Sequence, residues 1–424
     1  MNKWSVITAI LSAFCLWSCA QEVATPLFVC RKRLQNPYGV VSHFSHTTRD
    51  YPTQKEQIKL MKNAGIRNVR YDFWVPYNKD WSMQDNLQIL DTATWNTYKS
   101  DISLLGIIFV GWTGQRAWDE KSYYHEFLDY LISRYKDIVP YWEVMNEVNL
   151  TSESDRISID STFKCYMNLL PDTYKKLKSA NPKITVTSTG LGEIKDDFLE
   201  LICKFDVFNY FDVLNFHTYD LPESFPGKFH KIRDLMDKYH WNKPVWITEC
   251  GLPTQIDTSF QSGSISNAQK EQEQAYRLPR TYIISFAYGI DKVFTYNFRA
   301  KEINRYYTED NFGILHADLS PKPAYYAYKT MTMMMPVGST RPKLVRDGNF
   351  YYAQWMRPDG KKVYSFWNSK KKDLLKLDVK GKYTCFDIYG NTIKLEDDNL
   401  MVSPSIKYLV GRRSLKIKIK DQVL

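Results

Sequence analysis

Two glutamates, each closing a short apolar run, are the residues best placed to do chemistry. Glu147 ends the run Y-W-E-V-M-N-E, which follows Pro140, and Glu249 ends V-W-I-T-E, which follows Pro244. A short run of apolar and β-branched residues between turn signals predicts a buried strand. Both carboxylates are therefore expected at the carboxyl ends of core strands, where catalytic residues collect in a parallel barrel.

Two carboxylates that converge at one end of a barrel can cleave a glycosidic bond, because one can act as acid and base and the other as nucleophile. Either motif alone is also compatible with an unrelated glutamate in a helix-rich protein, but the two together favour a catalytic pair. A metal-dependent hydrolase is poorly supported, since the chain has seven histidines and no paired histidine motif. We therefore expect no metal and no cofactor.

The chain between residues 38 and 335 alternates strand-like with helix-like segments, as the barrel requires. This pattern predicts an α/β fold, either a closed (β/α)₈ TIM barrel or a doubly wound open sheet. The absence of a G-x-G-x-x-G loop from the sequence favours the barrel. The expected strands are Val40–Phe44, Arg67–Phe73, Ile107–Val110, Tyr141–Met145, Ile184–Ser188, Val213–Phe216, Val245–Thr248 and Lys292–Tyr296.

Helices are expected wherever apolar residues recur at helical spacing. Gly65 is the expected stop of the first helix, Pro171 is expected to break the helix that contains it, and Pro279 is expected to kink another. The predicted helices are Thr53–Ala64, Trp95–Leu104, Tyr123–Tyr135, Phe163–Ala180, Asp197–Phe205, Lys228–Tyr239, Asn267–Tyr288 and Pro323–Met335.

Residues 337–424 show a different pattern, with short alternating runs separated by turns such as Pro358-Asp359-Gly360. This pattern predicts a small C-terminal antiparallel β-sandwich. The segment contains 19 Lys and Arg against 9 Asp and Glu, so its net charge of +10 equals that of the whole chain. Such a basic surface could meet an acidic glycan, anionic lipid or lipopolysaccharide, or it could simply be a solvated face. No nucleic-acid reader motif is present, so nucleic acid is not an expected partner.

Residues 1–19 are expected to be a signal rather than part of the fold. Lys3 precedes a short apolar stretch that ends in L-W-S-C at Cys19, and this stretch is too short to span a bilayer comfortably. It resembles a bacterial lipoprotein signal, which implies acylation of Cys19 and a lipid-anchored protein of the cell envelope. Cleavage near the same point followed by simple secretion is the alternative.

Five cysteines remain after residue 19, so at least one thiol is free. Cys250 directly follows Glu249 and could be mistaken for a nucleophile. No histidine lies near it in the sequence, which favours the interpretation that Cys250 is a small apolar filler beside the site.

The motifs W-E-V-M-N-E and P-V-W-I-T-E-C-G resemble those on the fourth and seventh strands of clan A retaining glycoside hydrolases, which are (β/α)₈ barrels. Family-39 β-xylosidase-like and family-5 cellulase-like enzymes are the most similar groups. The resemblance continues in V-R-Y-D-F around Arg70, in N-F-H-T-Y at His217 and Tyr219, and in the segment Asn311–Tyr328. It covers roughly Val40–Lys329.

The resemblance implies that Glu147 is the acid and base and that Glu249 is the nucleophile. A buried, partly apolar setting would keep one carboxyl protonated, while cationic and hydrogen-bonding neighbours would hold the other ionised. Arg70 and Tyr219 are the expected donors to Glu249. Asn146 would bond the sugar 2-hydroxyl group.

Other residues are candidates with an open alternative. Trp112 is a possible sugar platform or a core residue, and His217 is a site residue or a structural histidine. Tyr296 stands where the clan usually has a tryptophan, which puts one sugar contact in doubt. Glu143 is expected to be a structural residue of the barrel.

The sequence thus predicts a retaining hydrolase that cleaves β-linked oligo- or polysaccharides by double displacement. A non-catalytic glycan-binding lipoprotein that keeps the barrel is the alternative; loss of either glutamate would favour it, and both Glu147 and Glu249 are present. A monomer is expected.

Overall fold

The computed structural model describes most of the chain after residue 21. The described residues are 22–45, 50–74, 83–109, 121–150, 159–192, 194, 196–205, 207–256, 267–370, 372–380, 382–395, 399–412 and 416–420. Cys19 and Trp112 lie outside these ranges. Among the described helices, none is both long and apolar enough to cross a membrane.

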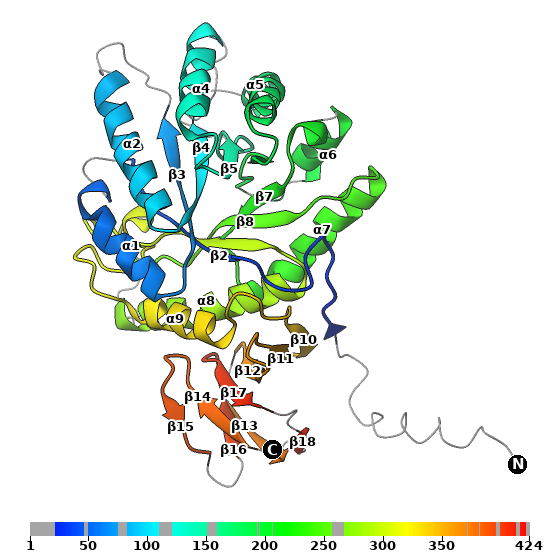
Figure 1. The fold of residues 1–424 in the computed structure, drawn as a ribbon. Helices are drawn as coiled ribbons and strands as arrows, with labels where there is room; N and C mark the ends of the chain where they lie inside the picture. The colour runs from blue at the N-terminus through cyan, green and yellow to red at the C-terminus, as the bar shows by residue number, and fades with distance from the viewer. Residues whose placement is uncertain are drawn as a thin grey trace, which may run out of the picture.

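Eight parallel strands form the barrel (Figure 1), in the order β6-β5-β4-β3-β2-β9-β8-β7. The two ends of this sheet meet through the parallel bridges Thr187 to Val213 and Leu191 to Phe216, which close the barrel between β6 and β7. The strands are β2 (Tyr38–Val41), β3 (Asn68–Trp74), β4 (Ser103–Phe109), β5 (Tyr141–Val144), β6 (Thr185–Thr187), β7 (Leu214–Thr218), β8 (Val245–Cys250) and β9 (Lys292–Thr295). The predicted (β/α)₈ barrel is confirmed.

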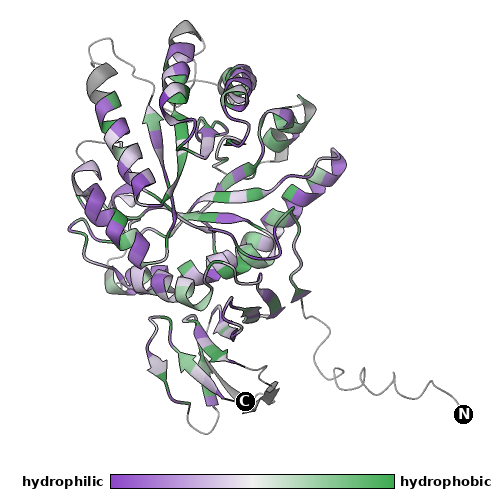
Figure 2. Cartoon of the chain, in the orientation of Figure 1, coloured by the Kyte–Doolittle hydropathy of each residue, from purple (hydrophilic) through white to green (hydrophobic). Residues whose placement is uncertain are grey.

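A helix follows each strand, and the helices surround the barrel with their polar sides outward, as the purple outer faces in Figure 2 show. In α7 the buried Phe225, Phe229, Ile232 and Met236 recur at helical spacing and face the strands. The helices are α1 (Gln54–Asn63), α2 (Met83–Lys99), α4 (Lys121–Tyr135), α5 (Ile159–Ala180), α6 (Asp196–Lys204), α7 (Phe225–Lys238), α8 (Asn267–Ala287) and α9 (Pro323–Met334).

Two helix predictions were wrong. Pro171 does not break α5, which runs without interruption from Ile159 to Ala180. Buried residues before and after the proline, such as Tyr166 and Leu177, hold both halves of the helix against the barrel and offset the lost backbone bond.

The helix predicted over Trp95–Leu104 is the end of α2, which begins earlier and stops at Lys99. The chain then turns through Asp101, whose φ is +58°, and Ser103 already pairs with Asn68 of β3. Ser103 and Leu104 therefore form a strand with β3 although their apolar spacing is helical. The predicted stop at Gly65 is confirmed, since Gly65 follows α1 with a φ of +76°.

Part of the barrel interior is filled by apolar side chains from several strands. Val41, Leu105, Val213, Trp246 and Phe294 form one buried cluster, as expected for a packed barrel interior. This cluster leaves the upper interior, towards the carboxyl ends of the strands, for polar groups.

Beyond α9 the chain forms two antiparallel sheets, in accord with the predicted sandwich. The larger has the order β1-β10-β11-β12-β17-β14-β15 and the smaller β16-β13-β18. Between them Tyr364, Phe366, Leu400 and Leu409 form a separate core. The strands are β10 (Lys343–Asp347), β11 (Phe350–Met356), β12 (Lys362–Asn368), β13 (Asp373–Lys380), β14 (Tyr383–Phe386), β15 (Thr392–Ile393), β16 (Asn399–Val402), β17 (Lys407–Gly411) and β18 (Lys416–Lys420).

The larger sheet also takes in a strand from the other end of the chain. β1 (Glu22–Val23) pairs antiparallel with β10, a contact that the sequence analysis missed. The sandwich lies beside α8 and α9 (Figure 1), and Trp355 Nε1 donates a hydrogen bond of 2.9 Å to Met334 O at the end of α9. Trp355 belongs to the same buried cluster as the residues around the barrel, so the barrel-facing side of the larger sheet shares a core with the barrel.

We predict that Trp355→Ala lowers the free energy of unfolding by about 3–5 kcal/mol, because a large, buried side chain leaves a cavity and Met334 O loses its donor. Chemical denaturation followed by circular dichroism measures the change. Trp95→Ala is the matched control, since Trp95 is 38% exposed. Equal losses for the two variants would contradict a shared core at the barrel–sandwich interface.

Candidate active site

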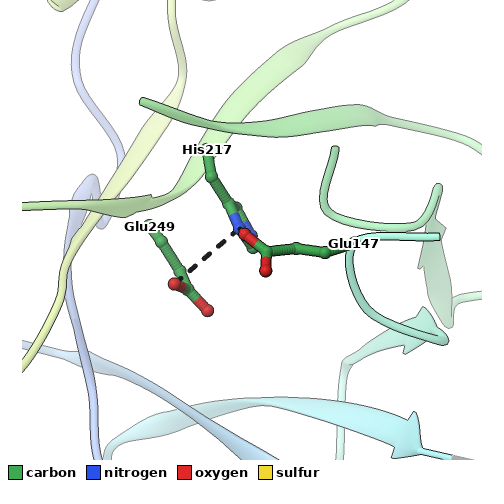
Figure 3. Close-up of side chains that lie close together, drawn as sticks. All are labelled: Glu147, His217 and Glu249. Carbon is green, nitrogen blue, oxygen red and sulfur yellow. Dashed lines mark hydrogen bonds and ion pairs between the residues drawn. The ribbon is translucent and has the colours of Figure 1, made fainter. Parts of the chain in front are cut away.

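Glu147, His217 and Glu249 point toward one another at the carboxyl ends of their strands (Figure 3). One side-chain atom from each of the three lies within 4.8 Å of the other two. His217 Nδ1 lies 2.7 Å from Glu147 Oε1 and 3.7 Å from Glu249 Oε2. The two predicted catalytic carboxylates, which are separated by about a hundred residues in the chain, thus share one small space.

Arg70 on β3 joins the residues of this site into one network. Its guanidinium group donates to Glu249 Oε1 at 2.5 Å, to both oxygens of Glu143 at 2.8 Å and to Asn146 Oδ1 at 2.6 Å. The Arg70 side chain is 1% exposed. Burial lowers the pKa of Arg70, but the charges of Glu143 and Glu249 raise it by more, so the residue remains cationic at every accessible pH.

Glu249 receives a second donor from the loop after β7. Tyr219 Oη donates to Glu249 Oε2 at 2.5 Å, while Arg70 occupies the other carboxylate oxygen. Burial and the nearby charge of Glu249 raise the pKa of Tyr219 well above its usual value, so the phenol stays protonated. Two donors, one of them charged, fix the orientation of the carboxylate.

A break in the strand register turns Glu249 into the barrel. Trp246 packs inside with the lower cluster, so strict alternation along β8 would place Glu249, three residues later, on the outer face. The pairing of β8 with β9 shifts between Ile247 and Cys250. Such an irregularity re-aims side chains, and here it lets both Trp246 and Glu249 face inward.

Glu147 is positioned by an unusual backbone conformation after β5. Met145 and Glu147 have φ values of +64° and +50°, a region that costs non-glycine residues about 1–3 kcal/mol each and is found most often at functional sites. The loop is held in place by the backbone bond from Glu147 N to Gly190 O at 2.9 Å and by the bridge between Asn146 and Gly190.

Glu147 and His217 form a buried, hydrogen-bonded pair. Burial raises the pKa of Glu147, but the hydrogen bond and the charge of His217, together with Arg70, lower it below its usual value. Burial lowers the pKa of His217, but Glu249 and Glu147 raise it above the usual value. The two side chains therefore share one proton over a wide range of pH. This differs from the expectation that an apolar environment keeps a single carboxyl group protonated.

Two supporting residues were missed or underestimated. Glu143, interpreted as a structural residue, binds Arg70 through both oxygens and also accepts the Gly190 N–H at 2.9 Å. A Cβ atom on Gly190 would lie 2.3 Å from His217 Nε2 and 2.7 Å from Glu143 Oε1. Only glycine fits there, and nothing in the local sequence pattern marks it.

Aromatic rings line the site near Glu249. Tyr296, which directly follows β9, lies with its ring centroid 6.3 Å from that of Tyr219 and 5.1 Å from that of Phe312. His43 approaches Tyr296 edge-on at 6.0 Å; it follows β2, so the strand-end rule that selected Glu249 could also have selected His43.

The remaining candidates for chemistry at this end of the barrel are a thiol and a metal site. Cys250 is buried, its sulfur lies 3.4 Å from Phe294 O, and burial and the charge of Glu249 raise its pKa. It is a poor nucleophile, as predicted. Glu147, His217 and Glu249 could in principle hold a metal ion, but the guanidinium group 2.5 Å from Glu249 opposes a second cation there.

Comparison with known proteins gives one family match. Residues 94–302 match the family model of the glycosyl hydrolase catalytic core, a segment that contains Glu147, His217 and Glu249. No curated protein matches the chain.

The fold is similar to that of several solved enzymes. A family 39 glycoside hydrolase from Bacteroides cellulosilyticus WH2 is 21% identical with a TM-score of 0.68, over 91% of this chain and 83% of that one. A glucosidase from Croceicoccus marinus is 13% identical with a TM-score of 0.63, over 93% and 99%. A family 30 subfamily 8 xylanase from Clostridium acetobutylicum is 11% identical with a TM-score of 0.58, over 90% and 97%. With the glycosyl hydrolase catalytic core matched over residues 94–302 and a (β/α)₈ barrel, the chain is a glycoside hydrolase whose fold is similar to that of these solved enzymes.

Proposed function

We propose that the protein cleaves β-linked glycans with retention of configuration, with Glu249 as nucleophile and Glu147 as acid and base. The observation that carries this proposal is the short separation of the two carboxylates, whose nearest oxygens lie within 4.8 Å. Retaining glycosidases place their carboxyl groups ~5–5.5 Å apart, whereas inverting enzymes leave room for a water molecule at ~6.5–9.5 Å.

In the first step Glu249 attacks the anomeric carbon as the glycosidic C–O bond breaks. Arg70 and Tyr219 donate hydrogen bonds to the carboxylate and fix its orientation, so that the attacking oxygen needs little reorganisation. Glu147 gives its proton to the departing oxygen. A covalent glycosyl ester on Glu249 results.

In the second step Glu147 takes a proton from water, and the resulting hydroxide displaces Glu249 from the anomeric carbon. Each turnover thus removes a proton from Glu147 and returns it. The lowered pKa of Glu147 and the raised pKa of His217 place the resting proton of the pair on His217. Bonded to Glu147 at 2.7 Å, His217 would deliver this proton to Glu147 as the leaving oxygen departs.

Asn146 is suited to bind the sugar next to the nucleophile. Arg70 occupies its carbonyl oxygen at 2.6 Å, which orients the amide and leaves the NH₂ group as the donor for a substrate hydroxyl. A bond from this donor to the 2-hydroxyl group would strengthen in the transition state. Tyr296, beside Tyr219, would offer a ring face to the same sugar.

The proposal includes a β-linked oligo- or polysaccharide as substrate and an enzyme of the family-39 or family-5 type. The names of the similar structures include a glucosidase and a xylanase, which supports this class of substrate. Acylation at Cys19, a place in the cell envelope and a monomeric state belong to the same proposal. A purely glycan-binding role is not favoured, because the carboxylates, Arg70 and Tyr219 form a complete catalytic arrangement.

Substitution of the two glutamates should have different consequences. We expect Glu249→Gln to abolish turnover of every substrate, because an amide cannot attack the anomeric carbon. Glu147→Gln should slow substrates with poor leaving groups most, since activated aryl glycosides need little protonation on departure. Steady-state kinetics on a series of aryl β-glycosides with graded leaving groups measures the difference.

Azide provides the control for these roles. It should restore some turnover of Glu147→Gln as a β-glycosyl azide, because a small anion needs no general base, and it should do nothing for Glu249→Gln. A 2-fluoro glycoside of the correct sugar should label Glu249. A label on another residue, or a first-formed product of inverted configuration, would refute the double displacement.

We predict that His217→Asn moves the alkaline limb of the kcat/KM profile to lower pH. In the native pair the last proton is lost only above the raised pKa of His217. Without His217 the pair loses the member whose pKa is raised, and only the carboxyl of Glu147, a group that ordinarily titrates below histidine, can hold the proton. His240→Asn is the matched control, since His240 is an exposed residue after α7. An unchanged or higher alkaline limb would contradict a shared proton.

We predict that Gly190→Ala lowers kcat/KM by roughly 100-fold, because the new methyl group displaces His217 and Glu143 from their positions. Gly227→Ala is the control, since a Cβ atom there meets nothing within 4 Å and the site lies in α7. Melting temperatures show whether each variant folds. A folded Gly190→Ala enzyme with native turnover would show that the close approach of Gly190 does not position the pair.

A further inference from the structure

A second concave surface lies far from the catalytic residues, between α9 and the larger sheet of the sandwich. This groove has a volume of about 880 Å³, near the upper end of the range of small-ligand sites. Met333 from α9 lines one side and is 47% exposed. Tyr383 and Phe386 from β14 line the other.

Two cations lie at the ends of strands that line this groove. Cys385 of β14 and Leu409 of β17 are paired neighbours, and both pack into the core between the two sheets. Residues one or three positions away therefore face the opposite side of the sheet, towards α9. Lys382, directly before β14, and Arg412, directly after β17, line the groove and are exposed.

Two further cations, Arg357 and Lys361, line the groove from the turn between β11 and β12. They share the carboxylate of Asp359, at 3.2 and 3.4 Å. Lys382 and Arg412 have no ion pair with any residue in the described part of the chain, and none of the described groove-lining residues is acidic. The groove therefore offers a net positive charge that the protein itself does not neutralise.

We propose that this groove is a second binding site that holds an anionic polysaccharide through its carboxylate or sulfate groups. Lys382 and Arg412 would form charge-assisted hydrogen bonds with these groups, and the ring of Phe386, on the same side of the sheet, would contact a sugar face. The recessed shape and this aromatic ring favour a glycan over a lipid surface, which would be met by a projecting basic face. The site goes beyond the cleavage proposed for the barrel.

Binding at this groove would keep the enzyme on a polymer between cleavage events. A chain held there raises the effective concentration of neighbouring segments at the active site without any new catalytic contact. Small aryl glycosides cannot span both places, so their turnover should not depend on Lys382 or Arg412.

The test compares the intact protein with the Lys382→Ala/Arg412→Ala variant. Affinity electrophoresis in gels containing polygalacturonate, dextran sulfate or neutral dextran measures binding, and flotation with phosphatidylglycerol vesicles measures attachment to lipid. We expect tight binding to at least one anionic polymer and none to dextran, with a loss of about tenfold or more in the variant. Turnover of a small aryl glycoside, where one is cleaved, should be unchanged.

The double variant Lys343→Ala/Lys394→Ala is the matched control, because it removes two exposed charges from the same sandwich outside the groove. Equal losses for the two double variants would overturn the proposal in favour of a diffuse basic surface. Binding to vesicles but to no polysaccharide would overturn the proposal in favour of a lipid-binding surface. No binding to vesicles or to any anionic polymer would show that the groove is a solvated basic face. These outcomes are measured without catalysis, so they are independent of the proposed cleavage.

Discussion

The structure of the active site depends on one buried guanidinium group. Arg70 is enclosed in the barrel and bonded to Glu143, Asn146 and Glu249. An unpaired charge in this position would be strongly destabilising, whereas one with several hydrogen-bonded partners is tolerated. Because Glu143 accepts from Nε and Nη2 of the guanidinium while Glu249 accepts from Nη1, the arginine cannot rotate away. The structural ion pair between β3 and β5 therefore sets the orientation of the proposed nucleophile on β8.

The charges of this network also suit the chemistry. Arg70 neutralises one of the two carboxylates that it contacts. The pair of Glu147 and His217 is neutral as long as the two side chains share one ionisable proton. The enclosed group thus keeps about one negative charge. The transition state of glycoside cleavage is an oxocarbenium-like cation, and fixed opposite charge in a water-poor site is an effective means of stabilising it. His217 supplies the proton for Glu147 in a different way from the apolar pocket that we expected.

The sequence predicted the barrel and the convergence of Glu147, Glu249, His217 and Tyr219, because each follows or ends an apolar run and strand ends in a barrel meet. Arg70, which lies within its strand, was expected from the family resemblance. It could not predict contacts that depend on the exact backbone path. The role of Gly190 depends on the backbone of its loop lying so close to His217 that no methyl group fits between them. The addition of β1 to the larger sheet depends on where the N-terminal segment lies after folding. Pro171 stays helical because tertiary packing outweighs a local preference.

The short separation of the two carboxylates results from two local irregularities. On β8 the register shift after Ile247 turns Glu249 inward, and after β5 the positive φ values of Met145 and Glu147 carry the second carboxylate toward it. Regular strands would leave at least one of them on the wrong face. The cost of this backbone conformation is offset by the bonds from the Gly190 loop to Glu147 and Glu143. The same loop therefore stabilises the strained backbone and fits against His217, which links the geometry of the acid to that of its proton partner.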